Sequence, residues 1–359
     1  SARNWPANPS SLHADGKAAR RALEEARARL AAVLDCRPAR LTLTSGGTES
    51  DSIVLLSLLR RREPGVLIIT SIEHPAVYDQ AAVLERMGWR VRRVDPRPDG
   101  IVDPGAVADA CDGVAVMAAV MAVNNETGAI QPLVQIREAL DAAAGTGRRI
   151  HLHADAAQAF GKIMFPPEAQ GVDSAALSAH KIRGPRGIGA LYLRRPLEPL
   201  AVGGGQEGGI RSGTENLPAA MGFALAAEIS ASRLAKESIQ ARALTDRLLV
   251  HLRDIPDAMP VPACRVPGDP RYSPWILSLS MPGLPGETAV RILSDAGFAL
   301  STGSACSGKR GGRRVLSAMG VPEEISLSAI RVSVGPTTSP AEMDSFAEAL
   351  RTAYLRYRI

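Results

Sequence analysis

Cysteine is scarce in this chain, with four residues among 359. They are Cys36, Cys111, Cys264 and Cys306. Their wide separation excludes a disulfide framework and a zinc ribbon, and it indicates a reducing compartment. Histidine is nearly as rare, with six residues, so the chain offers few ligands for a metal site.

Long apolar runs are also missing. The strongest, Val114 to Val123, is too short to span a bilayer, and no signal-peptide pattern opens the chain. The net charge of +5 comes from arginines spread along the sequence, a pattern that favours solubility or an acidic partner over nucleic-acid recognition. We therefore expect a soluble cytoplasmic protein without a membrane or nucleic-acid partner.

Lysine is the third scarce residue, because the chain has five lysines against thirty-seven arginines. Lys181 stands in an apolar, glycine-rich stretch from Ser178 to Gly189. In a chain that otherwise uses arginine for nearly all its basic residues, a lysine indicates an amine that must lose its proton, which arginine cannot do. Desolvation there would favour the neutral amine and a Schiff base with a carbonyl, as in pyridoxal phosphate (PLP) enzymes. The alternative is a solvated surface lysine.

A PLP site needs an acid beside the pyridine nitrogen, because a protonated ring draws charge away from the substrate. Asp155 ends an alternating run from Ile150, which predicts a strand with a carboxylate at its carboxyl end. Gln158 follows closely and is a candidate partner of the ring hydroxyl. His151 and His153 share a strand face with Asp155, so a metal site is the alternative. We rank it below PLP because nothing nearby completes a ligand set.

The cofactor phosphate needs backbone N–H groups at the start of a helix. Segment 41–50 predicts a short strand followed by the turn Gly46-Gly47. Thr48 then opens a helix that is predicted to run from Glu49 to Arg62. An ordinary helix cap is the alternative interpretation of this turn. Three residues elsewhere are candidates for further phosphate contacts: Ser178, His180 and Thr214.

His74 is the candidate for the imidazole plane that covers the cofactor ring. It comes just after the apolar strand predicted at Val66 to Thr70. The end of a strand favours a site residue over a core histidine.

Predicted strands alternate with helical patterns over most of the chain. The strands are expected at Val66–Thr70, Val114–Met121, Ile150–Ala154, Ala175–Ser178 and Ile188–Leu193, and the clearest helices at Pro75–Met87 and Leu133–Ala143. This alternation predicts an α/β fold, with a mostly parallel sheet flanked by helices in a large PLP domain over 8–235. Further strands and helices predict a smaller α+β C-terminal domain over 236–359, and residues 1–7 are expected to be the remnant of an N-terminal segment.

Eight sequence blocks together carry a family resemblance. They are Thr44 to Asp51, Glu73-His74, Val123 to Gly128, His153 to Gln158, Ser178 to Lys181, Arg211 to Thr214, Ser301 to Cys306, and Ile330 to Gly335. In this order they resemble cysteine desulfurases of the class V aminotransferase family, PLP enzymes of fold type I, over nearly the whole chain. The resemblance implies a homodimer that converts L-cysteine to L-alanine and takes up the sulfur as a persulfide.

The resemblance implies a role for each matching residue. Lys181 resembles the Schiff-base lysine, Asp155 the pyridinium partner and Gln158 the ring-hydroxyl partner. His74 resembles the stacking imidazole and proton carrier. The implied phosphate contacts are Gly47, Thr48, Ser178, His180 and, from the second subunit, Thr214. The implied substrate contacts are Asn8, Asn125 and Arg331, and an arginine fork suits a carboxylate because it donates two parallel hydrogen bonds.

Cys306 resembles the nucleophile that forms the persulfide. Small residues flank it and the basic stretch Lys309 to Arg314 follows, so we expect a mobile loop and a favoured thiolate. The other three cysteines are interpreted as incidental thiols. The resemblance implies delivery of the sulfur to a protein acceptor, a scaffold or relay protein as in iron–sulfur cluster assembly.

The chain departs from the family pattern at its start, and other functions remain as alternatives. Family members carry an Ala-Thr-Thr-Pro-like motif before the segment that matches Asn8, and this chain begins just short of it. A selenocysteine lyase or a class V aminotransferase would share the cofactor residues without needing Cys306. A non-catalytic scaffold would need neither Lys181 nor Cys306, and a nucleic-acid-associated protein would rest on the basic stretch alone.

Overall fold

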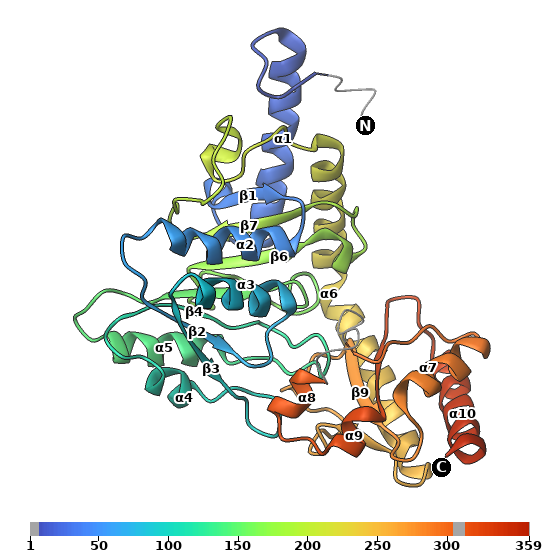
Figure 1. Ribbon diagram of the computed structural model, residues 1–359. Helices are drawn as coiled ribbons and strands as arrows, with labels where there is room; N and C mark the ends of the chain where they lie inside the picture. The colour runs from blue at the N-terminus through green and yellow to red at the C-terminus, as the bar shows by residue number, and fades with distance from the viewer. Residues whose placement is uncertain (1–6, 304–312, 359) are drawn as a thin grey trace. The chain divides into compact units, whose positions relative to one another are not determined.

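The computed structural model describes residues 7–303 and 313–358, which form two compact units (Figure 1). The large unit comprises the described residues up to Val94, Asp103–Ala122 and Pro132–Leu234. The small unit comprises Asp95–Val102, Val123–Gln131 and the described residues from Ala235 onward.

The large unit is built on a seven-stranded sheet (Figure 1). Its strands are β1 (Leu41–Thr44), β2 (Val66–Thr70), β3 (Arg90–Val94), β4 (Ala115–Ala119), β5 (His151–Asp155), β6 (Ser174–Ser178) and β7 (Gly189–Leu193). They lie in the order β1-β7-β6-β5-β4-β2-β3, and among the described strands every neighbouring pair is parallel except the two that β7 makes. The predicted mostly parallel sheet is therefore confirmed.

Helices flank this sheet. They are α1 (Ala14–Val33), η1 (Pro38–Arg40), α2 (Gly47–Ser57), η2 (Leu58–Arg60), α3 (Pro75–Arg86), α4 (Pro104–Asp109), α5 (Leu133–Ala144), η3 (Ala179–Ile182), η4 (Gln206–Gly209) and the first part of α6 (Leu217–His251). The side chains of β2 are buried on both faces, as in a sheet covered by helices, and Leu67 and Ile69 join Val54 of α2 and Val77 of α3 in one apolar core.

The edge strand β3 lies outside the predicted strands. Three of its five residues are arginines, so Arg90 to Val94 lacks the apolar run of the central strands. An edge strand tolerates this composition because one of its sides faces no neighbouring strand. Arg92 and Arg93 form ion pairs of 2.7 Å with Asp112 and 2.6 Å with Glu85. A prediction of strands from apolar runs alone therefore does not find β3.

The small unit has its own antiparallel sheet, in the order β10-β9-β8. Its elements after α6 are η5 (Leu252–Asp254), β8 (Met259–Val261), β9 (Ile276–Ser280), α7 (Gly286–Asp295), α8 (Arg314–Ala318), α9 (Glu323–Leu327), β10 (Ala329–Ser333) and α10 (Pro340–Tyr357). Leu277 and Leu279 of β9 pack with Leu293 of α7 and Phe346 of α10 in a separate core. The predicted smaller α+β fold is confirmed.

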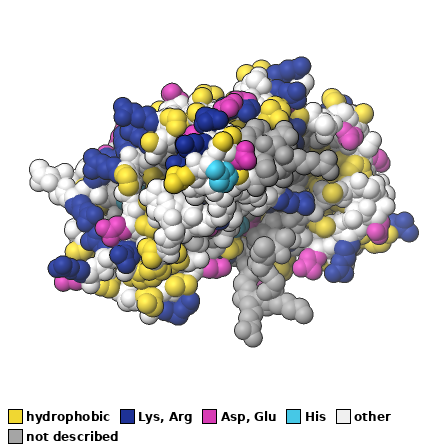
Figure 2. All heavy atoms as spheres, turned by 90° about the horizontal axis from the view of Figure 1, so that it is seen from above, with side chains coloured by type: hydrophobic (Ala, Val, Ile, Leu, Met, Phe, Trp, Pro, Cys, Tyr) yellow, Lys and Arg dark blue, Asp and Glu magenta, His cyan; other side chains and the backbone are white. Residues whose placement is uncertain are grey.

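Charged groups are dispersed over the surface. Figure 2 shows lysine and arginine side chains distributed over one face, with acidic side chains between them. Of the helices in the described part of the chain, none combines the length and the apolar character needed to cross a membrane.

Candidate active site

Most of the predicted site residues of the large unit follow the carboxyl ends of parallel strands. The Gly46-Gly47 turn follows β1, His74 follows β2, Asp155 ends β5, and Ser178 ends β6. Lys181 lies on η3 directly after β6. Because the carboxyl ends of parallel strands meet at one edge of a sheet, these residues share one edge, where ligands of open α/β sheets bind.

The turn after β1 is built to receive an anion. Thr44 Oγ1 and Ser50 Oγ both donate to the carbonyl oxygen of Gly46 over 3.1 Å, which fixes the turn at the start of α2. A Cβ on Gly189 of β7 would lie 2.7 Å from Gly46 Cα, so glycine is required at this close approach. A Cβ on Gly47 would lie 3.8 Å from the Cβ of Ser178, so β6 ends beside the turn. The first N–H groups of α2 have no acceptor within the helix, so the start of the helix beside the Gly46-Gly47 turn is suited to bind an anion.

Ser178 and His180 extend the turn's polar surface. Ser178 Oγ lies 2.9 Å from His180 Nδ1. Burial lowers the pKa of His180, and the positive charges of Lys181 and Arg186 lower it further, which favours a neutral ring at neutral pH. Thr48, in the first turn of α2, is exposed.

Asp155 is a buried carboxylate with one oxygen available. Its Oδ1 accepts a 2.9 Å hydrogen bond from Ala157 N, whereas Oδ2 has no hydrogen bond to the described residues. Burial raises the pKa of Asp155, and the Ala157 N–H and the charges of His74 and Lys181 oppose the rise. A buried carboxylate with an open oxygen is suited to pair with a ring cation.

His74 is held in one orientation. It caps α3, and its Nδ1 accepts a 3.1 Å hydrogen bond from Ala76 N, so the neutral ring carries its proton on Nε2. The preceding residue, Glu73, accepts from Thr70 Oγ1 at 2.6 Å and from Met121 N at 2.8 Å. These bonds tie the turn before His74 to the chain after β4.

Lys181 departs from one expectation. Its side chain is exposed among the described residues, so the desolvation predicted from its apolar sequence context is not observed. Lys181 lies on η3, which ends at Arg183 in a left-handed conformation with φ 64°. Nearby, Lys162 Nζ donates to Gln158 Oε1 at 2.7 Å, which leaves the Gln158 amide N–H groups for a ligand oxygen.

A buried hydrogen-bonded chain lies beside Asp155. His151 Nε2 and His153 Nδ1 contact Ser174 Oγ at 2.7 and 2.8 Å, and His153 Nε2 contacts Asp51 Oδ1 at 3.0 Å. Burial lowers the pKa of His153 to about 3. Burial also raises the pKa of Asp51 well above its usual value, and the charge of Asp155 adds to this rise. Both ring nitrogens of His153 are occupied, which argues against the alternative metal site on this strand face.

Acid stability tests the neutral state of His151. Burial lowers its pKa from 6.5 to about 4. Between these values the unfolded chain binds a proton that the folded chain does not, so the free energy of unfolding falls as pH decreases, by up to about 1.4 kcal/mol per pH unit. His151→Gln removes this titration and retains a polar group toward Ser174. Urea unfolding midpoints should show the wild type losing more stability than the variant between pH 6.5 and 4. Parallel curves would contradict a neutral, half-buried His151.

The small unit carries the predicted carboxylate-binding residues. Arg331, on β10, donates from Nη1 to the carbonyl oxygen of Asn125 at 2.8 Å. Its Nε is buried and has no hydrogen bond within the described residues. Burial lowers the pKa of Arg331, and the carboxylate of Glu126 opposes this shift. The arginine therefore keeps one buried donor without a partner among the described residues.

The turn that holds Asn125 is closely packed. Gly128 has φ 78°, and a Cβ there would lie 2.9 Å from Ile276 O, so only glycine fits. The buried Arg265 donates to Thr127 O at 3.1 Å and to Ile276 O at 2.7 Å. These contacts fix the turn beside Arg331 within the small unit.

The remaining predicted residues are not joined to these groups. Asn8 Oδ1 accepts a 2.9 Å hydrogen bond from Ser10 N, within its own turn. Thr214 is exposed after the Arg211 turn. Cys306 and the residues around it, 304–312, lie outside the described residues.

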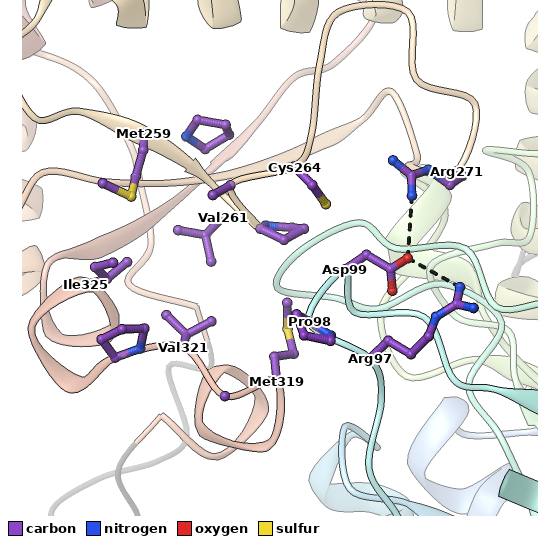
Figure 3. A pocket seen from close by; sticks show the side chains of 15 residues that line it. Arg97, Pro98, Asp99, Met259, Val261, Cys264, Arg271, Met319, Val321 and Ile325 are labelled. Carbon is purple, nitrogen blue, oxygen red and sulfur yellow. Dashed lines mark hydrogen bonds and ion pairs between the residues drawn. The ribbon is translucent and has the colours of Figure 1, made fainter.

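The other cysteines have distinct surroundings. Burial raises the pKa of Cys36 to about 11, and burial also raises that of Cys111, so neither favours the thiolate. Cys264 is exposed at an apolar cavity of about 570 Å³ in the small unit, where Arg271 and Arg97 form ion pairs with Asp99 (Figure 3). Its Sγ lies 3.5 Å from Tyr272 Oη.

Comparison with known proteins establishes the family. The family model described as aminotransferase class-V matches residues 2–346. The chain is a member of this family. It is 36% identical over 356 residues to a NifS/IcsS protein homolog of Lactobacillus delbrueckii subsp. bulgaricus, with 98% of this chain and 90% of that protein covered. It is 35% identical to the cysteine desulfurase IscS of Rickettsia akari, with 94% and 82% covered. The solved structure of a NifS-like protein matches with a TM-score of 0.89 and 32% identity, with 99% and 93% of the two chains covered.

Several residues of this family member escape the sequence patterns. Glu73 and Asp51 stand within blocks that carry the family resemblance, but the sequence assigns them no role, and it does not reveal that both are buried. Arg265 stands in a proline-rich connection that predicts only a loop. Its backbone acceptors belong to segments far away in the sequence.

Proposed function

We propose that this protein is a PLP-dependent cysteine desulfurase, which converts L-cysteine to L-alanine and transfers the sulfur to Cys306 as a persulfide. The observation that carries the proposal is the open carboxylate oxygen of Asp155, beside the charges of His74 and Lys181 and at the same sheet edge as the Gly46-Gly47 turn. The names of the curated relatives support the same activity.

The residues at this edge fit PLP. The start of α2 with Gly47, Thr48, Ser178 and His180 would hold the phosphate. Asp155 would pair with the pyridine nitrogen, Gln158 would donate to the ring hydroxyl, and Lys181 would hold the aldehyde carbon. When bound, PLP supplies an electron sink for negative charge at the substrate α-carbon.

The protein's own groups would bind the substrate and move its protons. Arg331 would bind the substrate carboxylate through donors that include its unpaired Nε, and the Asn125 side chain would add a further hydrogen bond. His74, covering the cofactor ring with its proton on Nε2, would carry protons to and from the substrate. Cys306 would then attack the substrate sulfur.

The proposal also covers the second subunit, the domain bounds, the location and the sulfur acceptor. The exposed Thr214 would complete the phosphate site of a second subunit in a homodimer. Asn8 would contact the substrate. We propose large and small domains over 8–235 and 236–359, a cytoplasmic location, and a protein acceptor for the persulfide sulfur.

Turnover of L-cysteine tests the activity. Purified protein with a thiol reductant should release alanine and sulfide in equal amounts, and it should be yellow. A colourless protein with no PLP on mass analysis would overturn the cofactor assignment. Turnover of selenocysteine alone would identify a selenocysteine lyase, and amino-group transfer to an oxo acid would identify an aminotransferase.

Asp155→Asn tests the ring partner. The variant should fold, because burial already opposes the charged form of Asp155 and asparagine has nearly the same shape. PLP should stay bound while kcat falls on the order of a hundredfold or more, since one preorganised charge is lost from the site. Cofactor content and single-turnover kinetics measure this. Asp79→Asn, an exposed position on α3, is the matched control and should keep wild-type kcat.

A further inference from the structure

The large unit has a cavity at the sheet edge opposite to the one that carries the predicted cofactor residues. This cavity has a volume of about 800 Å³ and is lined by η2, by the segment that enters β5 and by the segment that follows β7. The first residue of β6, Ser174, pairs with Leu193 at the end of β7, so the segment after β7 lies at the amino ends of the parallel strands. The predicted cofactor residues lie at the carboxyl ends. The two sites are therefore separate.

Six arginines line this cavity, which we call the arginine cleft. They come in three pairs: Arg60 and Arg61, Arg148 and Arg149, and Arg194 and Arg195. Only two carboxylates line it with them, Asp173 and Glu198. Positive charge therefore exceeds negative charge inside the cavity.

The existing ion pairs leave half of these arginines unused. Arg149 Nε lies 3.1 Å from Asp173 Oδ1, and Arg194 Nη1 lies 4.0 Å from the same oxygen. Arg60 Nε lies 3.9 Å from Glu198 Oε2. Within the described residues, no ion pair or hydrogen bond is made by the side chains of the remaining three: Arg61, Arg148 and Arg195.

Two of the unpaired guanidinium groups, those of Arg61 and Arg148, are exposed to solvent at the cavity, and their charges interact. Burial lowers the pKa of Arg61, and the charge of Arg148 lowers it further. Like charges held close together in a concave site store unfavourable energy that a bound anion relieves. The arginine cleft therefore carries an excess of positive charge that a bound anion would neutralise.

The cavity also has an apolar part. Leu58, Val116, Met117 and Leu197 line it together with the arginines. A volume of about 800 Å³ is of the size that small-molecule sites have. Guanidinium forks donate paired hydrogen bonds to phosphate oxygens.

We propose that the arginine cleft binds an oligophosphate group, either free or carried on a nucleoside. An oligophosphate carries several negative charges within one small volume. It can therefore contact the three unpaired arginines of the cavity at the same time. An extended acidic peptide spreads its charges along the chain on alternating sides, and it would meet fewer of these arginines at once. The proposal does not depend on the desulfurase activity.

Titration calorimetry with sodium tripolyphosphate and with ATP tests the proposal. The protein is first saturated with PLP, so that the phosphate site at the carboxyl edge is filled, and metal ions are chelated. Both ligands should bind at one site per chain, and added salt should weaken both. The Arg61→Gln/Arg148→Gln variant should bind both ligands about tenfold more weakly or worse, because it removes two charged donors. Should the protein bind no PLP, the loss of affinity in the Arg61→Gln/Arg148→Gln variant still reports on the arginine cleft alone, so the two proposals fail separately.

Matched variants separate a site from general surface charge. Arg21→Gln/Arg233→Gln removes the same charge from exposed positions on α1 and α6 and should change affinity less than about twofold. Tighter binding of ATP than of tripolyphosphate, abolished by Leu197→Ser, would support a nucleoside carrier, and equal affinities would support a free oligophosphate. The proposal is overturned by the absence of saturable binding up to about 1 mM, by an equal loss in the control variant, or by tighter binding of hexaglutamate, which would indicate a protein partner.

Discussion

Lys181→Ala is expected to abolish alanine and sulfide production while the protein remains folded. The family pattern assigns the covalent bond to a carbonyl to this lysine amine, and removing such a group costs several orders of magnitude in rate. The side chain is exposed, so its removal should change stability by no more than about 0.5 kcal/mol. Absorbance of the purified variant, cysteine turnover and thermal melting measure the three effects.

The scarcity of lysine provides a clean control. Lys17→Ala removes an exposed lysine from α1 and should leave both colour and turnover unchanged. Turnover by Lys181→Ala within tenfold of the wild type would remove this residue from the catalytic set. In that event Lys162, which already contacts Gln158, is the next candidate.

Cys306→Ala should eliminate persulfide formation and nearly all sulfide release. Sulfur abstraction needs a nucleophile other than the lysine, and this residue is the one the family pattern supplies. The variant should still bind PLP and still change its absorbance spectrum on addition of cysteine. Mass analysis of the protein after brief exposure to cysteine measures the persulfide. Wild-type sulfide release by the variant would favour a lyase that uses the same cofactor.

The other cysteines are matched controls for this variant. Alanine at Cys36, Cys111 or Cys264 should change turnover little, because burial opposes the thiolate at the first two, and the third lines a separate cavity (Figure 3). Neutralising Lys309 and Arg310 should impair transfer to an acidic protein more than release to a small thiol, and salt should shrink the difference. Arg313 is left intact in this test, because its guanidinium donates to Leu327 O at 3.2 Å and to Ala329 O.

The sequence predicts the central strands well because their apolar runs match their burial. β2 begins and ends at the predicted residues, β6 and β7 differ from prediction by one residue at one end, and β5 is shifted by one residue at both ends. β3 is missed because an edge strand need not be apolar. The helix predicted to reach Arg62 ends earlier, as α2 closes at Ser57 and continues as η2 to Arg60.

The site is predictable where it follows strand ends and unpredictable where distant segments meet. His74, Asp155 and Ser178 follow or end β-strands, so a strand pattern and residue chemistry suffice to find them. Lys181 is exposed although its sequence neighbours are apolar, and a single sequence does not reveal which side chains reach solvent. The arginine cleft joins three segments that are far apart in the chain, and a chain so rich in arginine gives no local signal for it.

The antiparallel strand β7 has a consequence for the order of folding. Among the described strands, β1 pairs with β7 alone, and Gly189 at the start of β7 packs against Gly46 in the turn that follows β1. This contact joins the first and the last strand of the large sheet in chain order. Closing so long a loop costs conformational entropy, so we expect the contact to form late in folding. During synthesis the Gly46-Gly47 turn therefore lacks its contact with Gly189 until β7 has emerged and docked. In a nascent large unit that lacks β7, the hydrogen bonds of Thr44 and Ser50 alone would hold this turn, so its final packing is a late event in folding.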